Sequence, residues 1–189
     1  GPEAKIDIVK AVATNLMNSI EEVNVGLMFF NYDEGGYVAH ALEDISTARS
    51  AIQQKVNDVV LGSPYSTYTP LSETLYEATQ YFMGRSVEYG NVGAIKSVAE
   101  SRVGDTYVSA LEEGCQKNFI VYLSDGEPTE DTGANSKITS LPSWSAVLGS
   151  SGCDGSGDGR CLDDLAEYLF KADLDPNLEG TQNVITYTV

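Results

Sequence analysis

Two hard oxygen ligands stand at positions that an α/β fold would bring to one edge of a sheet. Thr69 precedes Pro70 at a predicted helix start, and Asp125 lies in Ser124-Asp-Gly126 directly after the apolar run 119–123. A hydroxyl and a carboxylate suit Mg²⁺, Mn²⁺ or Ca²⁺. The residues alone leave a simpler interpretation open, in which Thr69 caps a helix and Asp125 fills a turn.

Two of the three cysteines bracket a loop rich in Gly and Asp. Cys153 and Cys161 stand at its two ends, and a disulfide across it would lower the entropy of the unfolded chain. A zinc site is the alternative, but the spacing lacks a CxxC pair or a nearby histidine. We therefore predict a disulfide and an oxidising compartment. Cys115 is left over, either as a buried thiol or with a partner outside these residues.

The same loop resembles the start of a calcium-binding loop. Asp154, Ser156, Asp158 and Gly159 follow the order of an EF-hand. However, Leu165 occupies the position of the bidentate Glu that such a loop needs. We expect weak Ca²⁺ binding or none.

Other chemistry finds little support in the sequence. There is no G-x-S-x-G elbow and no phosphate-binding P-loop. His40 is the single histidine and falls in a predicted strand, so a Ser/His or Cys/His mechanism would depend wholly on it. The sequence therefore predicts a binding protein and not an enzyme.

The net charge of the chain limits the classes of partner that it can bind. The 28 acidic and 11 basic residues give a net charge of −17. Such a field repels phosphate backbones, so we expect no nucleic-acid partner. It favours cations or basic partners, although a solvated acidic surface explains it equally. No apolar run reaches the ~18 residues of a membrane span, so we predict no transmembrane segment.

Alternation of helices and strands predicts a single α/β domain over residues 1–189, with ligands bound beyond the carboxyl ends of the strands. The apolar periodicity predicts helices over 6–20, 46–60, 70–82 and 162–170. Strands are predicted over 23–30, 37–42, 119–123 and 184–189, of which 37–42 is an antiparallel edge and 119–123 is buried on both faces. Ser46 and Thr69 are the predicted helix caps, and 84–114 and 127–161 are predicted insertions.

The order and spacing of three segments resemble the von Willebrand factor A (vWA) fold. They are the strand 23–30, the helix start Thr69-Pro-Leu71 and the segment 119–128. In that family a metal-ion-dependent adhesion site takes ligands from a D-x-S-x-S motif, a Thr before a helix and an Asp in a T/S-D-G motif. Thr69 matches the second and Asp125 the third.

Two blocks resemble more narrowly the PilY family of type IV pilus tip-associated proteins. The first is Cys115-Gln-Lys-Asn-Phe-Ile-Val-Tyr-Leu-Ser-Asp-Gly-Glu-Pro128. The second is the ending, from Cys161-Leu-Asp-Asp-Leu-Ala-Glu-Tyr-Leu-Phe170 through Gly180-Thr-Gln-Asn-Val-Ile-Thr-Tyr-Thr-Val189. The resemblance covers nearly the whole chain, and these blocks are its specific part.

The chain departs from the family at its start. It has no D-x-S-x-S, and it opens on the helix that should follow that motif. We therefore expect a Rossmann-like vWA open sheet, mostly parallel with one antiparallel edge strand and with helices on both faces, that lacks its first strand. The divalent-metal site (Mg, Mn or Ca) is then incomplete in this chain, with the ligands beyond Thr69 and Asp125 expected upstream.

The resemblance implies an adhesion module of a pilus tip protein at the bacterial cell surface, acting in pilus biogenesis, surface attachment and surface sensing. Its partners would be other pilus components and a protein or surface ligand that offers a carboxylate. Two alternatives remain open. One is a structural or force-bearing module in which metal is incidental, and the other is a vWA subunit of an intracellular metal-chelating machine.

Overall fold

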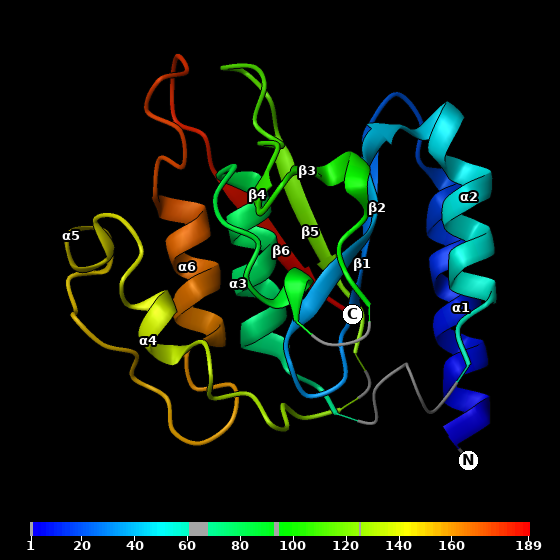
Figure 1. Cartoon of the computed structure of the whole chain (residues 1–189), viewed down its shortest axis with the longest axis horizontal. Helices are drawn as coiled ribbons and strands as arrows, with labels where there is room; N and C mark the ends of the chain where they lie inside the picture. Colours follow the sequence, from blue (N-terminus) through cyan, green and yellow to red (C-terminus); the bar gives the residue numbers. More distant parts are fainter. Residues whose placement is uncertain (1, 61–67, 93–94, 125) are drawn as a thin grey trace.

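The computed structural model describes residues 2–60, 68–92, 95–124 and 126–189 (Figure 1). The chain is a mixed α/β protein, as predicted. The larger elements are α1 (Pro2–Ser19), β1 (Asn24–Phe30), β2 (Gly36–Asp44), α2 (Ile45–Asn57), α3 (Leu71–Phe82), β5 (Asn118–Tyr122), α6 (Leu162–Lys171) and β6 (Val184–Thr188). The smaller ones are η1 (Tyr89–Asn91), η2 (Ala99–Ser101), β3 (Arg102–Val103), β4 (Thr106–Tyr107), α4 (Asn135–Ile138) and α5 (Trp144–Leu148).

The strands form three separate pairs among the described residues. β1 pairs antiparallel with β2, β3 antiparallel with β4, and β5 parallel with β6. The antiparallel β1–β2 pair and the parallel β5–β6 pair have the expected directions, but the mostly parallel open sheet that we predicted is not formed in the described residues. One reason is that the outer edge of β2 is already covered. The Val38 N–H donates to Ser97 Oγ, and the Val38 carbonyl accepts the Val98 N–H. The Leu42 N–H donates to the Tyr81 hydroxyl at 3.0 Å.

Helix α3 lies at the centre of the molecule. In Figure 1 it stands between α6 and the β1–β2 hairpin, while α1 and α2 stand together on the far side of that hairpin. All twelve residues of α3 are buried, polar ones included. A helix buried all round is normally apolar throughout, so each polar side chain of α3 needs a partner from another element.

Three hydrophobic clusters hold the fold in the described residues. The largest, here called the larger core, joins α3, α6, α5 and β6 around Leu75, Leu165 and Trp144, whose ring stacks on Tyr168 at 5.4 Å between centroids. A second lies between α1, α2 and β1 and includes Ile52. The third joins β2, α3 and β4 through Val38, Tyr81 and Tyr107. The hairpin therefore has helices on both of its faces, as predicted.

Strand β5 is not buried on both faces, so that prediction was wrong. Ile120 and Tyr122 face the larger core, but Phe119 is 51% exposed and Val121 44% exposed. Tyr187 of β6 stacks on Phe119 and is also exposed. An unalternating apolar run suggested burial on both sides, but in the described residues only one face of the β5–β6 pair packs against helices.

The N-cap of helix α2 lies two residues before the expected Ser46. Asp44 is its N-cap and accepts the Ser46 backbone N–H at 2.8 Å, so Ser46 is not the cap. In the part of the chain that the structure describes, no helix combines the length and the apolar character that a membrane crossing needs.

Candidate functional site

Thr69 lies where two loops meet at one end of the molecule. Its backbone N–H donates to Thr129 Oγ1 at 2.9 Å, and its carbonyl accepts the Thr129 N–H at 3.1 Å. The Thr69 hydroxyl donates to the carbonyl of Glu127. A hydroxyl whose proton is engaged in this way still presents lone pairs to a third group. The loop before α3 is therefore joined to the segment that follows β5.

Asp125 lies outside the described residues. The residues on either side of it are described. Ser124 N donates to the Val189 carbonyl at 3.4 Å, and a Cβ added to Gly126 would lie 3.9 Å from the Thr69 methyl. Gly126 thus lies beside Thr69.

Thr69 is not the cap of α3. Pro70 occupies the N-cap position, which has no side-chain cap. Instead Asp131, from the loop after β5, accepts the backbone N–H groups of Ser72 at 2.8 Å and Glu73 at 3.0 Å. Asp131 is fully buried, which raises the pKa of its carboxyl, while the two N–H bonds oppose that rise. A carboxylate at a helix N-terminus is favoured by the helix dipole, so Asp131 performs the capping role that the sequence suggested for Thr69.

A second buried carboxyl, Glu73, stands beside this cap. It is 3% exposed, and its Oε1 accepts the Gly133 N–H at 2.8 Å. Its Oε2 has no hydrogen-bond partner among the described residues. Burial, together with the nearby carboxylates of Asp131 and Glu34, raises the pKa of Glu73 to about 7.

A third buried carboxyl, Glu77, organises the predicted insertion 84–114. It accepts the backbone N–H groups of Glu88, Tyr89 and Gly90 at 3.2, 2.9 and 2.9 Å, and the Tyr107 hydroxyl at 2.6 Å. Burial raises the pKa of Glu77, and these four donors oppose the rise. A single carboxylate of α3 therefore fixes the backbone of residues 88–90 and the Tyr107 side chain within this segment.

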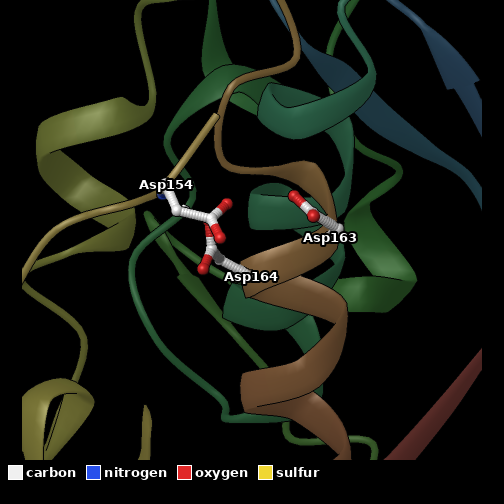
Figure 2. A group of neighbouring side chains, drawn as sticks. All are labelled: Asp154, Asp163 and Asp164. Carbon is white, nitrogen blue, oxygen red and sulfur yellow. Dashed lines mark hydrogen bonds between the residues drawn. The ribbon is translucent and has the colours of Figure 1, made fainter. Parts of the chain in front are cut away.

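Three further carboxylates gather at the start of α6. Asp154 comes from the cysteine-bracketed loop, and Asp163 and Asp164 come from the first turn of the helix (Figure 2). One oxygen of each lies within 4.8 Å of the others, so the three could together hold a cation. Partial burial, followed by the charges of Asp163 and Asp154, raises the pKa of Asp164, while the Asp154 backbone N–H bonded to it lowers that pKa.

This arrangement differs from the EF-hand order in the sequence. Asp158 points elsewhere and accepts the Asp131 backbone N–H at 2.9 Å. The sequence analysis did not group Asp163 and Asp164 with Asp154. The signal was present, because the loop returns to the helix that carries them.

The disulfide prediction is confirmed. Cys153 and Cys161 are bonded, with their Cα atoms 5.2 Å apart, and both are buried. Cys115 is free and exposed, so its interpretation as a buried thiol was wrong. His40 lies in β2 and pairs with Glu43 at 2.8 Å, as an ordinary strand histidine does.

Comparisons with models of known families, with curated proteins and with solved structures find no match. The residues and their geometry therefore carry the functional argument.

Proposed function

We propose that this chain is a vWA-type binding module of a PilY-family pilus tip protein and not an enzyme. It would bind a protein or surface ligand through a divalent cation at the loop edge that carries Thr69 and Asp125. The incoming ligand would offer a carboxylate, which completes the coordination of the cation. The residue resemblance supports this proposal, and so does the mixed α/β fold.

One observation carries the proposal furthest. Thr69 is joined by four hydrogen bonds to the segment 127–129, which follows the Ser-Asp-Gly motif along the chain. Two loops 60 residues apart in sequence therefore share one edge. The expected metal ligands Thr69 and Asp125 belong to these two loops. The family's remaining ligands come from a D-x-S-x-S that the chain does not contain, so we expect weak binding of the metal by these residues alone.

Retention on carboxylated beads tests the proposal, with Mn²⁺ as the added cation and a chelator as the reference. We expect retention in Mn²⁺ that the chelator removes and that Asp125→Ala abolishes. Asp154→Ala is the matched control, because it removes one carboxylate from the other acidic group. Equal retention with and without Mn²⁺ would contradict the proposal. Loss of retention in the Asp154→Ala variant alone would place the cation at the start of α6 instead.

A structural module is the second candidate, and the position of the disulfide favours it. Cys153 and Cys161 are 8% and 1% exposed and belong to the larger core. The disulfide therefore fixes both ends of the short polar loop between them to that core. The bridge is also compatible with an extracellular setting. Under this alternative, a chelator would leave attachment of the protein unchanged, whereas reduction of the disulfide would weaken it.

A further inference from the structure

Glu73 is a buried carboxyl with an unfilled hydrogen-bonding capacity. It lies in the first turn of α3 with 3% of its surface exposed. Its Oε1 accepts the Gly133 N–H, while Oε2 is buried and has no partner in the described ranges. A buried charged oxygen without a partner is costly, whereas a neutral carboxyl in the same place costs much less.

The groups around Glu73 are almost all acidic or neutral. Asp131 faces it from the loop after β5, Glu34 from the β1–β2 turn, and Tyr89 from η1. The Tyr89 hydroxyl also lacks a partner among the described residues. Lys137 lies over the Tyr89 ring at 4.6 Å, but its ammonium bonds to Glu88. No cation is among the groups that shift the pKa of Glu73. The described surroundings therefore offer Glu73 no counter-ion.

Glu73 and Asp131 differ in how strongly their surroundings favour the ionised form of the carboxyl. Asp131 accepts two backbone N–H groups at the start of α3, which favour its ionised form. Glu73 accepts one short N–H bond and faces the charge of Asp131. Two neighbouring buried carboxyls cannot both ionise cheaply, so the one with fewer donors retains its proton longer.

The position of Glu73 connects three parts of the chain. Its carboxyl accepts the Gly133 N–H of the 131–133 loop, faces Glu34 and the Gly35 backbone of the β1–β2 turn, and belongs itself to α3. Gly35 packs directly on the Tyr89 ring, where an added Cβ would lie 2.5 Å from a ring carbon. There is little room for these segments to shift while the carboxyl stays in place.

We propose that Glu73 is a proton-operated latch that joins α3, the 131–133 loop and the β1–β2 turn when its carboxyl is neutral. When the carboxyl ionises, the cost of burying its charge and its repulsion with Asp131 and Glu34 exceed what the Gly133 N–H bond returns, and the loop is released. The burial of Glu73, which raises its pKa to about 7, places the change near neutral pH. The latch concerns the position of the loop, and it operates whether or not that loop binds a cation.

Hydrogen exchange at the Gly133 amide tests the latch, after correction for the intrinsic pH dependence of exchange. For a carboxyl that titrates at 4.5 when released and at about 7 when latched, linkage gives about a tenfold loss of protection between pH 6 and pH 8. Glu73→Gln keeps an acceptor for the Gly133 N–H but cannot ionise. We expect this variant to hold the same protection at both pH values.

Glu130→Gln is the matched control, because it removes an exposed carboxylate from the same loop and should keep the tenfold change. Unchanged protection in the wild-type protein between pH 6 and pH 8 would overturn the latch. So would a tenfold change that persists in Glu73→Gln. If Glu73→Gln does not fold, carbon-13 NMR titration of the wild-type Glu73 carboxyl decides the matter. A midpoint close to 4.5 would then refute the proposal.

Discussion

Replacement of Glu77 by Gln should unfasten the segment 84–108 from α3. Glu77 is fully buried and faces four donors, three of them backbone N–H groups and one the Tyr107 hydroxyl. Oε1 accepts the Glu88 and Gly90 N–H groups and the Tyr107 hydroxyl, and an amide oxygen can take its place. Oε2 accepts the Tyr89 N–H, which would then face the amide N–H₂ without an acceptor, at about 1–3 kcal/mol.

Relief of the buried charge offsets part of this loss, because burial disfavours the ionised Glu77. The three bonds to the amide oxygen also weaken because they are no longer charge-assisted, so we expect the free energy of unfolding to fall by about 1–3 kcal/mol. Urea unfolding at pH 7 measures it, and exchange of the 88–90 amides localises the damage. Glu88→Gln is the matched control, because it breaks only a half-exposed ion pair with Lys137, worth about 0–1 kcal/mol. A loss in Glu77→Gln no larger than in Glu88→Gln would refute the reasoning.

Three further outcomes follow from the structure. Asp131→Ala should lower the unfolding free energy by about 1–3 kcal/mol, because it removes the acceptor of two N–H groups at the start of α3; chemical denaturation with an unchanged value would contradict this. Cys153→Ser with Cys161→Ser should cost about 2.5 kcal/mol for a loop of eight residues, and thermal unfolding with equal midpoints would count against it. Phe119→Thr should cost less than Ile120→Thr, because Phe119 is 51% exposed whereas Ile120 packs against the larger core; urea titrations with the reverse order would show that the face of β5 is misassigned.

Local patterns predicted most of the elements. The apolar spacing of α1 and α6, the alternation around β1 and β2, and the apolar run of β5 all depend on residues close together in the chain. The disulfide could be predicted for the same reason, since a short polar loop with cysteines at both ends needs no distant information. Helix starts were less secure, because Asp44 and Ser46 are both good caps and only the backbone geometry chooses between them.

The candidate site depended on distant pairs instead. Thr69 precedes the helix as predicted, but its hydroxyl turns to Glu127, and the cap of α3 comes from Asp131, 59 residues beyond Ser72. Glu77 has no sequence signal that separates it from a surface glutamate of an amphipathic helix. Only the packing of other segments around α3 buries it.

The sequence by itself therefore determined the longer helices and strands and which cysteines pair. The tertiary structure alone decided which carboxyls are buried and which groups satisfy them. The physical reason is that periodicity and capping act within one or two turns of chain. The desolvation of Glu73, Glu77 and Asp131 depends on what the rest of the molecule places around α3.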